Sequence, residues 1–443
     1  MKMSRCAFRS AINVTILMVL VWGYWGGAAM AAELHAGVAV TDISPDTEKF
    51  HVPLGGYGAR MNAPAQGIHD LTLAKALILQ QGDRKVALVT TDLLGIARSL
   101  REEVLARVAD VGITSDNLFL SASHSHGSAE MAAMNRKNVF QNKAIGIFDE
   151  SILLFTAERI AEAIVTANKE LIPVRVGSGT VALPGLNRNR RHEDGKTDED
   201  MTIARFDTMD GKPWVVFVNY TAHPTFMNER VMHLSADWPG YLQRNVEGFM
   251  DGVVCMYTNG AEGDVATRGA DGPSPFARAE DYGRKLAVHA LKLIDSIETN
   301  PEAELDFSMQ DLQLPPATPP PALLQSAGPE YGMTEDNIKA LLDAMCPPTS
   351  YLGVLRIGDM CAVSIPGEMA TLPGLEIKAA LREAGVRNPV ILGLTNEWIS
   401  YILPPEEYDK GGYEPGVSFY GKDLGPVTVK QAIEAGKAVL ARN

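Results

Sequence analysis

The chain has 443 residues, of which 46% are hydrophobic and 21% are charged, a composition typical of a globular protein with a sizeable core. Its 54 acidic residues outnumber its 40 basic residues and give a net charge of −14 at pH 7. This negative charge disfavours nucleic acids and anionic membrane surfaces as partners, so we expect neither. The composition leaves the oligomeric state open.

Residues 1–31 have the layout of a secretory signal peptide. Basic residues precede an apolar stretch, and the small-residue pattern Ala29-Met30-Ala31 ends it. An uncleaved anchor helix is the alternative interpretation, but no basic stop-transfer flank follows the apolar stretch. We therefore expect cleavage after Ala31, no stable membrane anchor in the mature protein, and a secreted or periplasmic location.

The mature chain keeps three cysteines, Cys255, Cys346 and Cys361. An oxidising location would permit a bridge between Cys346 and Cys361, but this odd and sparse set is no disulfide framework. We therefore expect the stability of the protein to come from its hydrophobic core.

Apolar runs and amphipathic runs alternate along the chain. In the first part, the predicted strands are residues 85–95, 117–123, 174–183, 202–208, 214–224 and 252–264, the last of which ends in a loop. The predicted helices of the same part are residues 98–112, 150–171, 240–250 and 278–298. After a proline-rich crossover near residues 314–322, the strands are residues 351–368 and 388–404, and the helices are residues 372–385 and 428–442. This order predicts an α/β fold with mixed β-sheets covered by helices, in one large domain at residues 32–443.

Several common active-site motifs are absent from the sequence. No G-x-G-x-x-G or Walker loop follows a predicted strand, and no G-x-S-x-G elbow occurs. The sequence therefore disfavours a nucleotide-binding protein and a hydrolase whose nucleophile is a serine in a G-x-S-x-G turn.

Two histidines follow the predicted strand at residues 117–123. His124 and His126 are separated by one serine, and side chains two residues apart on an extended chain point to the same side. One imidazole can hold a zinc ion while its neighbour, which titrates near neutral pH, moves protons. The alternative interpretation is that both rings only hydrogen-bond nearby backbone.

Three further residues are candidates for the same site. His223 leaves a predicted strand at a proline turn, and histidines at two strand ends of one α/β chain favour a shared site. Glu368 stands where the next predicted helix begins, so it can ligate a cation or cap the helix. Tyr401, flanked by apolar residues, is on its own typical of a core side chain.

Five segments of the chain carry a resemblance to a known family. They are SASHSHGSAE, NYTAHPTFM, NGAEGDVATR, IPGEMATLPG and NEWISYILPPEEY. In order and style they resemble the neutral/alkaline ceramidase family, whose zinc amidases have H-T-H-S, A-x-H-P, N-x-G-D-V-S-P and P-G-E segments and a tyrosine-rich segment ending in E-E-Y. HAGVAVTDISP and GIHDLTLAKALIL are similar to the opening strands of that family, so the resemblance covers nearly the whole mature chain.

The resemblance implies a role for each matching residue. The implied zinc ligands are His124, His223, Glu368 and Tyr401. His126 falls on the histidine that works beside the metal. Arg190 falls on an arginine near the scissile carbonyl, and the nearby Arg188 competes for the same assignment.

This set of residues suits the hydrolysis of an amide. A zinc ion lowers the pKa of bound water and polarises a carbonyl group. His126 can take a proton from the water and return it to the leaving amine. Arg190, which is permanently charged, can stabilise the developing oxyanion.

The chain departs from the family pattern in three places. Ala266 replaces a serine that in the family lies near the polar head group of the substrate, which leaves Asn259, Asp264 and Thr267 as candidate substrate-binding residues. We therefore expect ceramide not to be the preferred substrate. Trp398 stands where the family has a tyrosine, so the pocket wall differs. The chain ends soon after the matched segments, so we expect no C-terminal immunoglobulin-like domain.

Three functions of different classes remain. The leading one is a zinc-dependent hydrolase that cleaves the amide bond of an N-acylated, lipid-like or ceramide-related substrate. The second is an esterase or lactonase that uses the same site. The third is a binding protein that keeps the metal without activity, although the presence of all four ligand positions and of His126 speaks against it.

Overall fold

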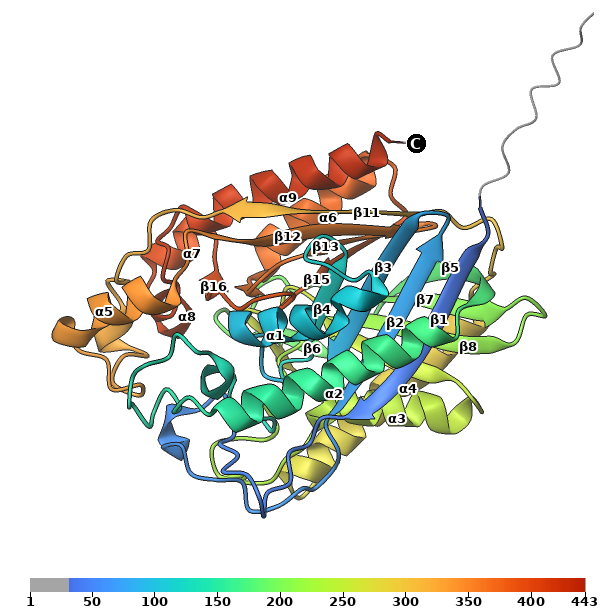
Figure 1. Ribbon diagram of the computed structural model, residues 1–443. Coiled ribbons are helices and arrows are strands. Elements are labelled where there is room, and N and C mark those ends of the chain that lie inside the picture. Colours follow the sequence, from blue (N-terminus) through green and yellow to red (C-terminus); the bar gives the residue numbers. More distant parts are fainter. Residues whose placement is uncertain (1–31, 443) are drawn as a thin grey trace, which may run out of the picture. The chain divides into compact units, whose positions relative to one another are not determined.

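The computed structural model describes residues 32–442, and the predicted signal peptide lies outside these residues (Figure 1). The largest element is a mixed sheet of eight strands. In spatial order these strands are β4 (Leu118–Ala122), β3 (Arg84–Thr91), β2 (Leu73–Gln81), β1 (Leu34–Asp42), β5 (Ile172–Ala182), β7 (Asp200–Thr208), β8 (Pro213–Tyr220) and β9 (Val254–Asn259). The outermost pairs, β3–β4 and β8–β9, are parallel, and the pairs between them are antiparallel.

A second sheet has four strands. They are β11 (Leu305–Gln313), β12 (Thr349–Ile357), β13 (Met360–Ser364) and β15 (Asn388–Leu392), and only the β13–β15 pair is parallel. Two small ladders complete the strands, β6 (Asn187–Asn189) with β10 (Val265–Thr267) and β14 (Glu368–Met369) with β16 (Tyr401–Ile402).

The nine α-helices of residues 32–442 connect and cover these sheets. They are α1 (Arg98–Val108), α2 (Glu150–Lys169), α3 (Asp237–Phe249), α4 (Pro275–Ser296), α5 (Glu335–Met345), α6 (Thr371–Glu383), α7 (Pro405–Asp409), α8 (Tyr413–Gly416) and α9 (Leu424–Leu440). Parallel neighbours need a crossover, and α1, α3 and α6 supply it for the three parallel pairs of the two larger sheets. The small β14–β16 ladder is also parallel.

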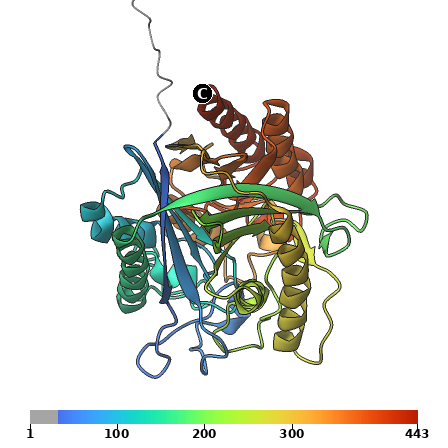
Figure 2. The same cartoon turned by 90° about the vertical axis from the view of Figure 1, so that its right-hand side faces the viewer.

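The two sheets pack face to face, and helices cover their outer faces (Figure 2). The core between the sheets joins Phe119 and Phe217 of the large sheet to Leu355 and Val390 of the small one. Helices α1 and α2 pack against one half of the large sheet, α3 and α4 against the other half, and α6 and α9 against the small sheet. Strands buried on both faces explain the nearly continuous apolar runs in the sequence. The predicted α/β fold with mixed sheets under helices is confirmed.

Some predicted elements differ from the structure. Strand β11 and helix α5 were not predicted, and the prolines of residues 314–322 form no regular element, as expected. The strand predicted at residues 388–404 is wrong beyond Leu392. Leu394, Asn396 and Ser400 have positive φ angles, so the chain turns out of the four-stranded sheet after Leu392. Before β16 begins, Thr395 makes a single isolated bridge with Ser121 of β4. Residues 393–400 are therefore buried as a loop rather than as part of a strand.

The structure also bears on the cysteines and on membrane insertion. Cys255, Cys346 and Cys361 are free thiols, so no bridge joins Cys346 to Cys361. Among residues 32–442, no helix combines the length and apolar character that crossing a membrane requires.

Candidate active site

The ends of three strands bring the candidate residues together. His124 and His126 follow β4, His223 follows β8, and Glu368 follows β13. In open α/β sheets, the carboxyl ends of parallel strands are where ligands bind. The sequence places the candidate histidines and Glu368 at these three strand ends, and the topology brings the three ends together.

His124 and His223 each leave one ring nitrogen free for a ligand. The Nδ1 atom of His124 lies 2.6 Å from the carbonyl oxygen of Leu94, and Nδ1 of His223 lies 2.7 Å from that of Glu262. A donated Nδ1–H fixes the tautomer and leaves Nε2 as the basic nitrogen. Both rings are therefore oriented as metal-binding histidines usually are.

The two histidines of the H-S-H segment are close for a different reason than the one expected. His124 has a φ of 73°, so the chain is not extended at this point. A left-handed conformation of a residue other than glycine costs about 1–3 kcal/mol and persists only where the surrounding structure imposes it. The kink turns the His124 ring edge-on to the His126 ring, with 4.8 Å between the ring centres.

Glu368 joins the two ligand histidines. Its Oε2 atom lies 3.0 Å from Nε2 of His223 and 3.4 Å from Nε2 of His124, and its Oε1 atom accepts a hydrogen bond of 2.8 Å from Trp398. Burial raises the pKa of Glu368, but the two histidines outweigh this effect and hold that pKa well below its usual range. Glu368 is therefore ionised and points into the cluster.

The donor atoms fit one small cation. Zinc ligands at about 2.0–2.2 Å in a tetrahedron are about 3.3–3.6 Å apart, close to the separations of 3.0 and 3.4 Å around Glu368. Tyr401 lies directly opposite Glu368 in the β14–β16 ladder, so its side chain belongs to the same face. The predicted ligands His124, His223, Glu368 and Tyr401 are thus brought together.

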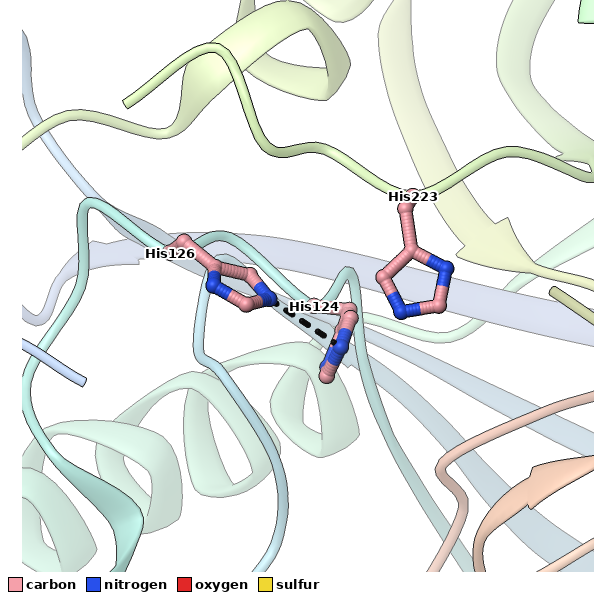
Figure 3. Close-up of side chains that lie close together, drawn as sticks. All are labelled: His124, His126 and His223. Carbon is pink, nitrogen blue, oxygen red and sulfur yellow. Dashed lines mark hydrogen bonds between the residues drawn. The ribbon is translucent and has the colours of Figure 1, made fainter. Parts of the chain in front are cut away.

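His126 stands beside this cluster and offers an alternative ligand. Its Nε2 atom lies 3.3 Å from Nε2 of His124. Each of His124, His126 and His223 has a ring nitrogen that lies within 4.8 Å of a ring nitrogen of the other two (Figure 3). The Nδ1 atom of His126 is buried and has no hydrogen-bond partner among the described residues. Burial, followed by the charges of His124 and His223, lowers the pKa of His126 well below its usual value, so the ring is neutral and able to accept a proton.

Arg190, rather than Arg188, faces the cluster. The side chain of Arg188 is exposed, whereas Nη2 of Arg190 donates to the hydroxyl of Tyr401 at 3.0 Å. Its Nε atom donates to Glu414 at 2.8 Å. Arg190 therefore contacts a candidate metal ligand directly.

An apolar cavity of about 160 Å³ opens next to the cluster. His124, His126, Glu368 and Tyr401 form its polar end. Its other walls come from several loops and short turns and from α5 and α8: Gly56, Leu94, Glu130, Met131, Ala132, Ile145, Leu323, Tyr331, Met333, Leu341, Met345, Trp398, Tyr413, Val417 and Phe419. Such a cavity suits a ligand with an aliphatic or aromatic portion.

Sequence reasoning missed three polar residues on these walls. The hydroxyls of Tyr331 and Tyr413 lie 3.0 Å apart, and burial raises the pKa of Glu130 to about 7. Tyr413 lies 12 positions after Tyr401 and five residues beyond the end of the family-like segment NEWISYILPPEEY, so no motif marked it. Tyr331 and Glu130 could not be found, because only the tertiary fold brings them to the cavity.

The three predicted substrate-binding residues do not line this cavity. The side-chain amide of Asn259 donates to the carbonyl oxygens of Ser123 and Ala222. Asp264 accepts hydrogen bonds from Thr371 and Asn189, and Thr267 lies on β10. Asn259 and Asp264 are committed to joining loops beneath the site, so the structure does not support a direct contact with a ligand in this cavity.

Comparisons with known proteins agree with this geometry. The family described as neutral/alkaline non-lysosomal ceramidase, N-terminal, matches residues 34–271 and 340–429. A neutral ceramidase of Pseudomonas aeruginosa is 24% identical over 95% of this chain and 73% of its own length. Neutral ceramidase B of Dictyostelium discoideum is 23% identical over 87% of this chain and 69% of its own length.

Two solved structures share the fold. The crystal structure of neutral ceramidase from Pseudomonas aeruginosa has a TM-score of 0.79 at 21% identity and covers 93% of this chain and 75% of that one. A ceramidase complexed with C2 has a TM-score of 0.77 at 19% identity, with 93% and 76% covered. The family match spans more than half of the chain, so the chain belongs to the neutral/alkaline non-lysosomal ceramidase family of amidohydrolases.

Proposed function

We propose that this protein is a zinc-dependent hydrolase that cleaves the amide bond of an N-acylated, lipid-like substrate. The observation that carries the proposal is the convergence of His124, His223 and Glu368, with a neutral His126 beside them, at the polar end of an apolar cavity. The family membership supports amide hydrolysis as the reaction.

Zinc is the metal that suits this set of donors best. Imidazole nitrogens and a carboxylate are ligands that zinc accepts, and the phenol oxygen of Tyr401 would add a fourth donor. A bound zinc ion would supply an activated water molecule and polarise the scissile carbonyl. His124, His223, Glu368 and Tyr401 would hold the metal.

Proton transfer, stabilisation of charge and binding of the apolar part of the substrate fall to the residues around the metal. His126 is neutral, so its free ring nitrogen can take a proton and later deliver it to the leaving amine. Arg190 donates to the hydroxyl of Tyr401, and from there its positive charge would stabilise the negative charge that develops during attack on a carbonyl. The apolar walls exclude water and receive the acyl or amine chain of the substrate.

The relatives indicate the class of substrate. The curated relatives are named neutral ceramidases, which supports a ceramide-related acyl amide for this chain. Ala266 forms a β-bridge with His223, so the position where the family has a serine adjoins the cluster. Without that hydroxyl we propose that simpler acyl amides are cleaved at least as well as ceramide itself.

We also propose that the protein acts outside the cytoplasm. The proposal rests on the signal-peptide pattern of residues 1–31 alone. Sequencing the N-terminus of protein secreted from its host would test it, with a mature chain starting at Ala32 as the expected result.

The experiment that tests the proposed function is turnover of paired fluorogenic substrates. Each pair shares one acyl chain and differs only in an amide or ester link to the dye. Amide turnover that a chelator abolishes and added zinc restores is the expected result. Turnover of the esters alone would favour the esterase, and binding without turnover would favour a binding protein.

A further inference from the structure

Two consecutive arginines are held by carboxylates from the segment that follows Tyr401. Nε of Arg190 donates to Oε1 of Glu414 at 2.8 Å, and Nη1 of Arg191 donates to Oε2 of the same carboxylate at 2.5 Å. Glu407 accepts a hydrogen bond of 3.0 Å from Nε of Arg191. We call Arg190, Arg191, Glu407 and Glu414 the arginine clamp.

The clamp is largely buried. The side chains of Arg191, Glu407 and Glu414 are 9%, 9% and 7% exposed, and that of Arg190 is 22% exposed. The charges of Arg190 and Arg191 outweigh the effect of burial on Glu414 and lower its pKa, so the carboxylate stays ionised. Buried charged groups hold their partners in one geometry, because no water can replace the lost contact.

The clamp ends on a candidate metal ligand. Nη2 of Arg190 donates to the hydroxyl of Tyr401 at 3.0 Å, so Arg190 connects Glu414 to Tyr401. A guanidinium group is planar and rigid, so fixing its Nε atom also fixes the direction of Nη2. The position of the Glu414 carboxylate therefore decides where Arg190 places its hydrogen bond on the phenol oxygen.

Hydrogen bonds of the backbone hold the turn at residues 189–192, which carries both arginines, without help from Glu414. The backbone N–H of Arg190 donates to the carbonyl oxygen of Asp264 at 2.7 Å. The side-chain oxygen of Asn189 accepts from the backbone N–H groups of Arg191 and His192 at 2.9 and 3.0 Å. Because the turn is held in this way, replacing Glu414 changes the direction of the Arg190 side chain rather than the path of the chain.

From this geometry we propose that Glu414 is a positioning residue for the metal site. Through Arg190 it holds the hydroxyl of Tyr401 in place as a ligand beside Glu368. The inference rests on the proposed function, since it requires that the site binds zinc. Partners that orient a metal ligand typically contribute a factor of about 10–100 to metal affinity.

Zinc affinity of the metal-free protein, measured by competition with a chromophoric chelator, tests the proposal. Glu414→Gln should bind zinc about 10–100-fold more weakly than wild type. The matched control is Glu247→Gln, which breaks another ion pair with a buried partner, Lys75, at 2.6 Å, away from the site. The control should keep wild-type zinc affinity, which separates a loss of position from a general loss of stability.

A second variant keeps the test decisive if Glu414→Gln does not fold. Arg190→Lys retains the positive charge but lacks the planar fork that reaches Glu414 and Tyr401 together. It should lose zinc affinity to a similar extent, and wild-type affinity in either variant overturns the positioning role. A wild-type protein that binds no zinc would instead overturn the proposed function itself.

Discussion

Gly56 lies against the ring of His126 and gives a direct test of how that histidine is held. Its φ is 86°, and a Cβ atom added there would lie 2.1 Å from Nδ1 and 2.6 Å from Cε1 of His126. Alanine in a left-handed conformation costs about 1–2 kcal/mol. Overpacking of a filled site costs about 1–3 kcal/mol more. Gly56→Ala should therefore lower the free energy of unfolding by about 2–5 kcal/mol or displace the His126 ring.

Gly112→Ala is the matched control for this change. Gly112 has a φ of 76°, but nothing lies within 4 Å of the added Cβ atom, so only the backbone cost of about 1–2 kcal/mol applies. The assays are urea unfolding and kcat for an acyl amide. We expect Gly112→Ala to keep wild-type kcat, and Gly56→Ala to lose about 100-fold or more if the ring moves. Gly56→Ala with normal kcat and the stability of Gly112→Ala would refute this account of the contact.

Three further outcomes follow from the site. His126→Ala should lower kcat by about 100-fold or more while the fold persists. Near-normal turnover in this variant would show that His126 has a structural role only. Ala266→Ser should raise kcat/KM for ceramide relative to a simple N-acyl amino acid, and a wild-type enzyme that strongly prefers ceramide would contradict the expectation. Burial lowers the pKa of His223 from 6.5 to about 4, so in metal-free protein the unfolded state binds a proton that the folded state does not. The free energy of unfolding should therefore be constant with respect to His223 above pH 6.5 and should fall by about 3 kcal/mol between pH 6.5 and pH 4. Urea unfolding at several pH values would measure this fall. His223→Ala should flatten this dependence, and an equally steep fall in that variant would contradict the assignment.

The alternation of strands and helices could be predicted because buried strands and amphipathic helices leave distinct apolar periods. The helix predicted at residues 98–112 is α1 with a short 3-10 turn, and it ends at Gly112 in a left-handed conformation. Helix α5 was missed after the proline-rich run, although Thr334 and Asn337 form a capping box at its start. The strand prediction beyond Leu392 failed because an apolar run can be buried equally well as a loop.

The candidate site was predictable only in part from the residues themselves. The spacing of His124 and His126 and the strand-end position of His223 indicated a shared site, and Glu368 could equally have been a helix cap. Tyr401 came from the family resemblance alone. The clamp partner Glu414 and the cavity walls depend on contacts between segments far apart in the sequence, and no local pattern specifies those contacts.

The ligand set is the central claim, and metal analysis of three proteins tests it most directly. Wild type, purified without chelator, should hold about one zinc per chain. His223→Ala should lose most of that zinc, whereas His126→Ala should keep it, because His126 is assigned to proton transfer rather than to the metal. Loss of zinc in both variants would show that His126 is a ligand in a three-histidine site. Absence of zinc from the wild-type protein would contradict the account altogether.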